Sequence, residues 1–282
     1  MIKRIKNYLH DMRDRQRIGI ALSKGGAMMQ ARSVDLTKPT TWEFSGFSQN
    51  GEDGILDVLR SQLMSANRYF IEIGTSDGIE NNSAWLVVAE KYSGIMVEGN
   101  PRLVERASRM VAGYSLGVEC HSMFVTLENV QDLISMSLHK DPDIFSLDID
   151  GNDYYIAKAV LNGGIRPKIF VVEYNSVYGP TQSMTVEYRD DFAFTAAHLT
   201  QLYYGVSIAG WRKLFEPRGY RFITVDRNGV NAFFVDQAFS NPIFLENVGG
   251  LEFAENRYQY KKFRMPSSEQ FALIADQKFI SI

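Results

Sequence analysis

Cysteine and long apolar runs are almost missing from this chain. Its 282 residues include one cysteine and four histidines. The single cysteine, Cys120, cannot form an internal disulfide, so a reducing, cytoplasmic compartment is expected and a thiolate zinc site is excluded. No apolar run approaches the ~18 residues that a membrane-spanning helix needs.

Excess charge of one sign is also missing. The net charge of −3 gives no electrostatic reason to expect nucleic acid as the main partner. What is present is a composition of 45% hydrophobic, 22% charged and 12% aromatic residues, which is typical of a globular protein with a sizeable core. The length allows two small domains, or one large domain with additions.

The first 31 residues differ from the rest because they are strongly basic. Apolar residues recur there every three or four positions: Ile2, Ile5, Leu9 and Met12. This spacing predicts an amphipathic helix. We expect Gly25-Gly26 to end it and 32–46 to be a polar linker, so that 1–46 form a basic helical extension. Docking on the domain or on a second copy in a homo-oligomer is favoured over peripheral contact with a membrane.

Short apolar segments alternate with helical periodicity from residue 47 onward. Strands are expected at 69–73, 95–97, 117–124, 144–149 and 168–172. Helices are expected after Asn50 and at about 81–91, 101–112, 127–138 and 153–162. This alternation predicts a parallel sheet with right-handed crossovers and strands buried on both faces.

The second part of the chain is less regular. Residues 176–207 form a long aromatic insertion, and a helix near 208–217 leads into a predicted hairpin of 220–225 and 231–235. Residues 237–282 show no readable pattern, and we expect them to pack on the domain 47–236 as a C-terminal extension.

Polar residues follow the ends of the predicted strands, where ligands bind in open α/β sheets. The loop Glu72–Gly78 after the first strand has two glycines, where the dinucleotide fingerprint needs three. Its acids suit a positively charged amino-acid group, such as that of S-adenosylmethionine. Glu98 ends the second strand and can accept both ribose hydroxyls of an adenosine. An ordinary turn and a surface acid are the alternatives, and together the two features favour an adenosine ligand.

A third cluster is expected where the fourth and fifth strands end. It contains oxygen-bearing side chains only: Asp148, Asp150, Glu173 and Asn175. Such a set suits a hard divalent cation such as Mg²⁺ or Ca²⁺. The alternative, left open, is that Asp150 and Asn152 cap the next helix while Asn175 satisfies loop backbone.

The insertion adds aromatic side chains that can stack on sugars, and one histidine. His198 could take a proton from an acceptor, with Asp150 as the rival base. More often such a histidine is structural.

Seven motifs, in this order along 47–236, resemble the FkbM-type S-adenosylmethionine-dependent methyltransferases. The motifs are Ser48–Asp53, Phe70–Gly78 with Asn82, Gly94–Pro101, Ser146–Tyr154, Glu173–Asn175, Tyr204–Ser207 and Asn231–Val235. The resemblance implies a class I, Rossmann-like α/β sheet of seven mostly parallel strands, with the last strand antiparallel. It also implies transfer of a methyl group to a hydroxyl of a sugar, a polysaccharide or a sugar-containing natural product.

The same resemblance assigns residues to the cofactor. Those that would hold it are Gly74, Asp77, Gly78 and Glu98, and those that would close over it are Gln49, Glu52 and Asp53. The expected cofactor site is completed by Glu72, Asn82 and Asp148. Two other interpretations remain: a nicotinamide-dependent oxidoreductase, against which the missing third glycine argues, and an inactive scaffold subunit, against which the intact site residues argue.

Overall fold

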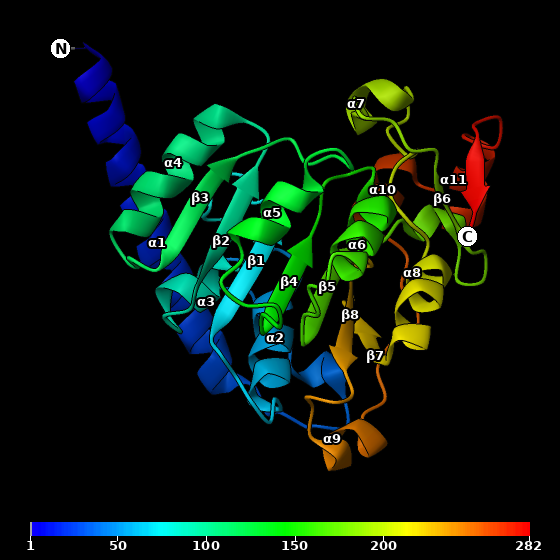
Figure 1. The fold of residues 1–282 in the computed structure, drawn as a ribbon, viewed down its shortest axis with the longest axis horizontal. Helices are drawn as coiled ribbons and strands as arrows, with labels where there is room; N and C mark the ends of the chain where they lie inside the picture. Colours follow the sequence, from blue (N-terminus) through cyan, green and yellow to red (C-terminus); the bar gives the residue numbers. More distant parts are fainter. Residues whose placement is uncertain (1) are drawn as a thin grey trace.

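Seven strands form one sheet in the order β3-β2-β1-β4-β5-β8-β7 (Figure 1). The computed structural model describes residues 2–282, with side chains from Tyr8 onward. Neighbouring strands are parallel, except that β8 is antiparallel to both β5 and β7. The strands are β1 (Tyr69–Ile73), β2 (Ser93–Glu98), β3 (Val118–Ser122), β4 (Ile144–Leu147), β5 (Ile169–Glu173), β7 (Tyr220–Val225) and β8 (Asn231–Asp236). The predicted Rossmann-like sheet with an antiparallel last strand is therefore confirmed.

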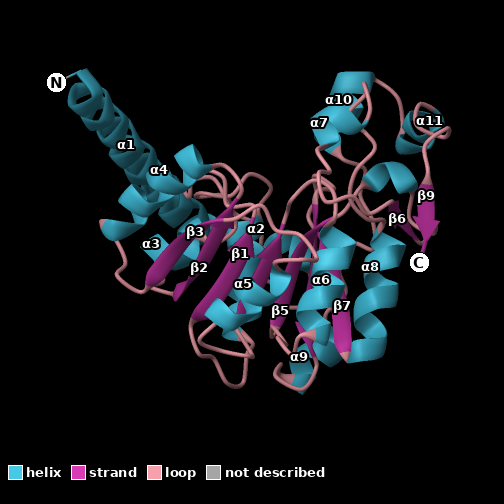
Figure 2. Ribbon diagram, turned by 45° about the horizontal axis from the view of Figure 1, so that its top comes forward, coloured by secondary structure: helices cyan, strands magenta, loops and turns pink. Residues whose placement is uncertain are grey.

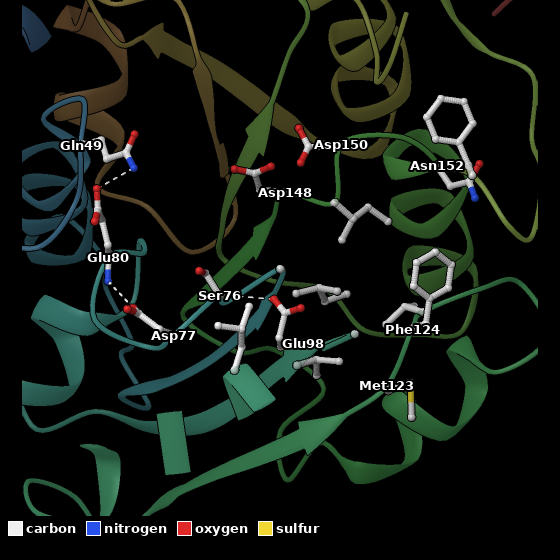
Figure 3. Close-up of a pocket in the computed structure, with 18 residues that line it drawn as sticks. Gln49, Ser76, Asp77, Glu80, Glu98, Met123, Phe124, Asp148, Asp150 and Asn152 are labelled. Atoms are coloured by element: carbon white, nitrogen blue, oxygen red, sulfur yellow. Dashed lines mark hydrogen bonds between the residues drawn. The ribbon is translucent and has the colours of Figure 1, made fainter. Parts of the chain in front are cut away.

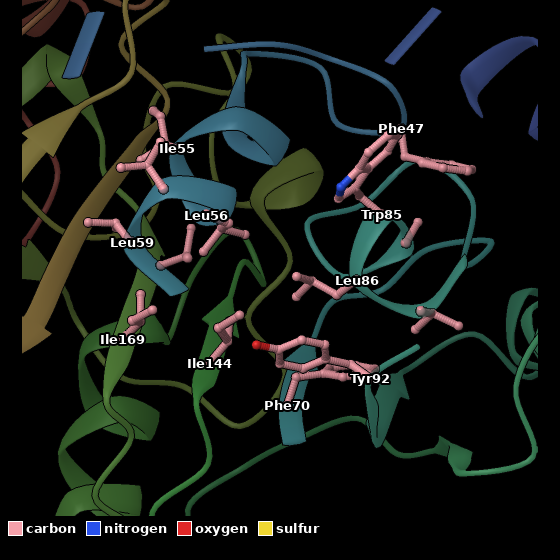
Figure 4. Close-up of a cluster of buried hydrophobic side chains, with 14 of the residues drawn as sticks. Phe47, Ile55, Leu56, Leu59, Phe70, Trp85, Leu86, Tyr92, Ile144 and Ile169 are labelled. Atoms are coloured by element: carbon pink, nitrogen blue, oxygen red, sulfur yellow. The ribbon is translucent and has the colours of Figure 1, made fainter. Parts of the chain in front are cut away.

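Each face of the sheet carries its own hydrophobic core. Phe70 belongs to one core and its neighbour Ile71 to the other, because successive strand residues point to opposite faces. The first face is covered by α1 (Ile2–Ala31), α2 (Glu52–Ser61), α3 (Ala84–Val88), α4 (Pro101–Ala112) and α9 (Pro242–Asn247). The second is covered by α5 (Val130–Met136), α6 (Asp153–Asn162) and α8 (Ile208–Phe215). Figure 4 shows Leu56 and Leu59 of α2 beside Ile144 and Ile169 of the sheet.

Helix α1 is one continuous helix of 30 residues, and the prediction that it ends at Gly25-Gly26 is wrong. A Cβ on Gly25 would lie 2.5 Å from Cζ3 of Trp85 and 3.0 Å from the Cα of Gly46. Glycine therefore allows α1 to approach α3 closely, and this packing outweighs the ~1 kcal/mol that glycine costs inside a helix. Ile18 and Ala21 of α1 are buried, so the helix docks on the domain.

The segment 32–46 was expected to be a polar linker, but its aromatic residues lie inside the first core. Trp42 and Phe44 are 0% and 1% exposed. The indole Nε1 of Trp42 donates a hydrogen bond to the carbonyl oxygen of Asp35 at 2.7 Å. This segment, which includes a short 3₁₀ helix (Pro39–Thr41), thus joins α1 to the sheet as part of one core.

The insertion and the C-terminal extension build a smaller unit together. Strand β6 (Met184–Val186) pairs antiparallel with β9 (Phe279–Ser281). The other elements of this unit are a 3₁₀ helix (Ser176–Tyr178), α7 (Phe194–Ala197), α10 (Arg257–Phe263) and α11 (Ser267–Ala272). They lie together beyond the ends of α6 and α8 (Figure 2) around a third core that includes Tyr178, Tyr203 and Ile274.

The hairpin predicted around Asn228-Gly229 is present between β7 and β8, and a 3₁₀ helix (Glu216–Arg218) precedes it. Within residues 2–282, no helix combines the length and the apolar character needed to cross a membrane.

Candidate active site

A cavity of about 470 Å³ lies at the carboxyl ends of β1, β2 and β4, where the sequence places its polar clusters (Figure 3). Of the residues predicted for cofactor, metal or catalysis, its wall includes Gln49, Gly74, Asp77, Glu98, Asp148 and Asp150. The volume falls within the ~300–1,000 Å³ that is usual for small-molecule sites. The parallel strands therefore bring side chains from distant parts of the chain to one opening.

The loop after β1 turns sharply enough to let β4 approach. Gly74 has φ +90°, and a Cβ there would lie 1.7 Å from the carbonyl oxygen of Asp148. No other residue type fits this position. Gly78 lies against Ala107 of α4 and is not among the residues that line the cavity.

Glu98 is held at the end of β2 by two backbone groups. Its carboxylate accepts hydrogen bonds from the N–H of Ser76 at 2.9 Å and of Asn100 at 2.8 Å. Ser76 itself has φ +50°, so the loop is shaped to reach this carboxylate. Each carboxylate oxygen keeps a further lone pair, and apolar side chains of Leu103 and Met123 lie in the same cavity wall.

Asp77 lines the cavity but is already engaged by two arginines. Its Oδ2 lies 2.6 Å from Nη1 of Arg17 in α1 and 3.0 Å from Nη1 of Arg106 in α4. Burial alone would raise the pKa of Asp77, but hydrogen bonds from Arg17 and from the backbone of Ile79, with the charges of both arginines, lower it. The acid thus fixes the loop against α1 and α4. Sequence reasoning missed both arginines, because Arg17 lies 60 positions away.

A smaller cavity of about 110 Å³ adjoins the first and shares Gln49, Gly74, Glu80 and Asp148 with it. The predicted residues Glu52, Glu72 and Asn82 line this recess. Asn231, which the sequence did not single out for the site, lies there with a buried Oδ1 that has no hydrogen-bond partner among the described residues. The recess therefore offers acceptor oxygens to a positively charged donor.

The side chain of Glu72 in β1 lies on the first face of the sheet, the same face as Phe70. It accepts hydrogen bonds from the backbone N–H groups of Asn82 and Ser83, both at 3.0 Å. Burial raises the pKa of Glu72 to about 7. The side chain of Asn82 in turn donates to Oγ of Ser146 at 3.0 Å. These two residues hold the start of α3 against the sheet as well as lining the recess.

The residues predicted to close over a cofactor divide into two kinds. Gln49 lines the cavity, and its Nε2 donates to Oε1 of Glu80 at 2.7 Å (Figure 3). Asp53 lies outside the cavity walls, and its carboxylate accepts from the backbone N–H of Gly46, Phe47 and Ser48. Asp53 therefore shapes the loop that carries Gln49.

Three carboxylates meet where β4 and β5 end. Asp148, Asp150 and Glu173 can each offer an oxygen within 4.8 Å of the others. Oε2 of Glu173 is buried without a hydrogen-bond donor from a backbone N–H or a basic side chain among the described residues. Burial and the neighbouring carboxylates raise the pKa of Asp148 and of Glu173, and burial with the charge of Asp153 raises the pKa of Asp150 to about 6.

The backbone at Asp150 is held in an unusual conformation. Its φ is +53°, which non-glycine residues rarely adopt. The carboxylate of Asp153 accepts hydrogen bonds from the N–H of Ile149 at 3.0 Å and of Gly151 at 2.8 Å, one on each side of Asp150. Asp153 therefore fixes the turn that presents Asp150. Asn152 is the N-cap residue of α6, but its side chain makes no capping hydrogen bond.

Asn175 and His198 do not line the larger cavity. Nδ2 of Asn175 donates to the carbonyl oxygens of Leu202 and Tyr204, while its Oδ1 accepts from Val177, so the side chain satisfies loop backbone. These contacts agree with the alternative stated for the sequence, in which Asn175 satisfies loop backbone. His198 lines none of the cavities described here, and its Nδ1 lies 2.8 Å from Oγ1 of Thr200. Among the two candidate bases, Asp150 alone lies in the cavity wall.

Known proteins resemble this chain in structure only, and at low sequence identity. No protein-family model and no curated protein matches the sequence. The structure is similar to the O-methyltransferase from Bacillus cereus in complex with SAH, at 15% identity over 78% of this chain and 89% of that one, with a TM-score of 0.43. It is similar to the O-methyltransferase TomG from Streptomyces achromogenes in complex with SAM, at 19% identity over 76% and 87%, with a TM-score of 0.42. At such identities and scores the likeness concerns strand and helix arrangement alone.

Proposed function

We propose that this protein transfers a methyl group from S-adenosylmethionine to a hydroxyl group. The observation that carries the proposal is that Glu98 lines a cavity with apolar side chains in its wall, and that an acidic recess adjoins this cavity. A nucleoside joined to a charged amino acid needs these two environments side by side. The FkbM-like motifs support the same function and favour a sugar, polysaccharide or sugar-containing natural product as the acceptor.

The larger cavity fits the nucleoside part of this cofactor. Glu98 is oriented by two N–H donors and can accept both ribose hydroxyls. The side chains of Leu103, Met123 and Phe124 provide apolar surface for a base beside it. We infer that Glu98 binds the ribose and that these side chains flank the adenine.

The recess fits the amino-acid part. Its buried acceptor on Asn231 is unpartnered, and the carboxylates of Glu52 and Glu72 lie in the same wall. A buried acceptor without a donor is costly, so a ligand ammonium group would be stabilising there. The charge of Asp77 is neutralised by Arg17 and Arg106. We therefore assign binding of the ammonium group to the recess and not to Asp77 in the loop Glu72–Gly78.

Bound S-adenosylmethionine supplies a methyl group on a sulfonium, from which an acceptor oxygen displaces a neutral thioether. The acceptor hydroxyl must lose its proton as the new bond from oxygen to carbon forms. Asp150 lies in the cavity wall without a hydrogen-bond donor of its own and can take that proton. The turn held by Asp153 orients the carboxylate for this role.

We further propose a divalent cation at Asp148, Asp150 and Glu173. The donor set fits Mg²⁺, because it consists of carboxylate oxygens, and the unpartnered Oε2 of Glu173 is unexplained without a cation or a proton. Such a cation would lower the pKa of a bound acceptor hydroxyl.

The cofactor proposal is tested by calorimetric titration of the full chain with S-adenosylhomocysteine. We expect binding by the natural sequence, and Glu98→Gln should bind at least tenfold more weakly because charged hydrogen bonds to the ribose are lost. Glu105→Gln on the exposed face of α4 is the matched control and should bind normally. Absence of binding by the natural sequence, or binding of a nicotinamide dinucleotide in its place, would overturn the proposal.

The cation is tested separately, by terbium luminescence and by competition with Mg²⁺. Asp150→Asn and Glu173→Gln should each weaken terbium binding by at least tenfold, whereas Asp191→Asn in the exposed insertion should leave it unchanged. Equal terbium signals from the natural sequence and all three variants would remove the cation from the proposed function.

A further inference from the structure

A separate cavity of about 180 Å³ lies between the insertion and α10, and Asp150 forms part of its wall. Asp150 also lines the larger cavity, so the two spaces meet at this carboxylate. Lys262 of α10 reaches across, with Nζ 3.5 Å from the carbonyl oxygen of Thr200 and 3.3 Å from Oε1 of Gln201. The cavity is therefore bounded by two segments that are distant in the chain and tied to each other.

Aromatic side chains form much of this wall. Phe194 and Tyr204 come from the insertion, with ring centroids 6.2 Å apart, and Tyr258 comes from α10. Aromatic faces give apolar contact area with defined geometry, and a small number of polar groups among them then fixes the orientation of a ligand. A ring that has an apolar face and a polar rim matches such a wall.

Among the polar groups of the wall, which also include Asp150 and Lys262, Tyr204 and Gln259 form a hydrogen-bonded pair. Nε2 of Gln259 donates to the hydroxyl oxygen of Tyr204 at 3.0 Å. This contact leaves Oε1 of Gln259 buried without a donor among the described residues. Tyr204 is only 5% exposed, and its own hydroxyl proton has no acceptor among the hydrogen bonds of the described residues. One free donor and one free acceptor thus stand beside each other, which is a strong sign of a missing partner.

We propose that this cavity is the acceptor subsite and that it takes a neutral sugar ring. Tyr204 donates a hydrogen bond to one sugar oxygen, Gln259 accepts from a neighbouring hydroxyl, and the aromatic side chains contact the ring face. The hydroxyl to be methylated then lies at Asp150, where the two cavities meet. This assignment deepens the proposed function and rests on it. It places a residue of the C-terminal extension, Gln259, in direct contact with substrate.

The test measures binding of methyl glycosides of the common neutral hexoses and deoxyhexoses to the full chain by saturation-transfer NMR, with and without S-adenosylhomocysteine. Tyr204→Phe removes only the hydroxyl and Gln259→Leu removes the amide. Tyr260→Phe is the matched control, because Tyr260 is an exposed tyrosine on the same helix. Calorimetry with S-adenosylhomocysteine, together with thermal unfolding, reports whether each variant keeps its fold.

We expect at least one glycoside to bind, and the two site variants to bind it about tenfold more weakly than the control. Affinity for S-adenosylhomocysteine should be the same within twofold in all four proteins. Failure of every glycoside to bind, or equal binding by the variants and the control, overturns the subsite. Failure of S-adenosylhomocysteine to bind overturns the proposed function instead, and the glycoside comparison made without it still decides the subsite.

Discussion

At the scale of single residues, buried carboxylates of this protein serve two different purposes. Asp53, Glu72 and Asp153 each accept hydrogen bonds from two or more backbone N–H groups and so fix the loops around the site. Asp148 and Asp150 lie only five and three positions before Asp153. Their carboxylates nevertheless accept no hydrogen bond from a backbone N–H group of the described residues. Backbone donors therefore distinguish acids that shape the site from acids that remain free for a ligand.

Asp53 gives a prediction about pH. Burial raises its pKa to about 7 in the folded protein, whereas the unfolded chain should titrate near the ordinary value of 3.8. Between these values the folded state binds a proton that the unfolded state has lost, so this group's contribution to stability falls as the pH rises. The unfolding free energy should fall relative to that of Asp53→Asn by roughly 2–4 kcal/mol from pH 4 to pH 8.

The measurement is urea denaturation of both proteins at several pH values. Asparagine keeps an oxygen for the three N–H donors and removes the titration, so the difference between the two proteins isolates this carboxyl group. A difference that stays constant with pH would contradict the assignment.

At the scale of elements, helices and strands could be predicted from the sequence where their buried residues recur at regular spacing. The bounds predicted for β1, α4, α6 and β7 agree with the structure, because each has an uninterrupted pattern of buried positions. The short helices α10 and α11 bury few residues and were not predicted. Glu98 and the three clustered acids were found because they lie at the ends of strands or within three residues after them. The contacts of Asp53 were not predicted, because its hydrogen bonds go to backbone groups of an irregular loop, which leaves no spacing signal.

The adjacent glycines of α1 give a second prediction. Alanine favours a helix by ~1 kcal/mol over glycine, and a Cβ on Gly26 meets nothing within 4 Å. Gly26→Ala should therefore raise the unfolding free energy by about 0.5–1 kcal/mol. Gly25→Ala should lower it by about 1–3 kcal/mol, because its Cβ would collide with Trp85. Chemical denaturation of both variants checks this, and stabilisation by Gly25→Ala would contradict the close packing of α1 on α3.

At the scale of the whole molecule, the cofactor cavity and the acceptor subsite belong to different parts of the fold. The strand ends of the large sheet form the first, and the insertion with α10 forms most of the second. The short sheet of β6 and β9 holds the insertion in place, and Phe279 of β9 contacts Tyr178 and Tyr203 with ring centroids 5.5 and 5.3 Å apart.

Removal of residues 278–282 should therefore separate the two functions. Affinity for S-adenosylhomocysteine should stay within twofold, while glycoside binding is lost and chymotrypsin cleaves within 176–207 at least tenfold faster. Phe279→Ala, which keeps the strand, should give a smaller increase in cleavage. An unchanged cleavage pattern in the shortened protein would show that β9 does not support the insertion.

The pairing of β6 with β9 also has a consequence for biosynthesis. The two strands lie more than ninety positions apart, and a ribosome makes the chain from its N-terminus. Strands β1 to β5 can assemble before the partner of β6 exists, so the nascent chain passes through a stage at which Tyr178 and Tyr203 are uncovered. In the cell, this aromatic surface is the part of the growing chain that a chaperone would be expected to protect until β9 has been made.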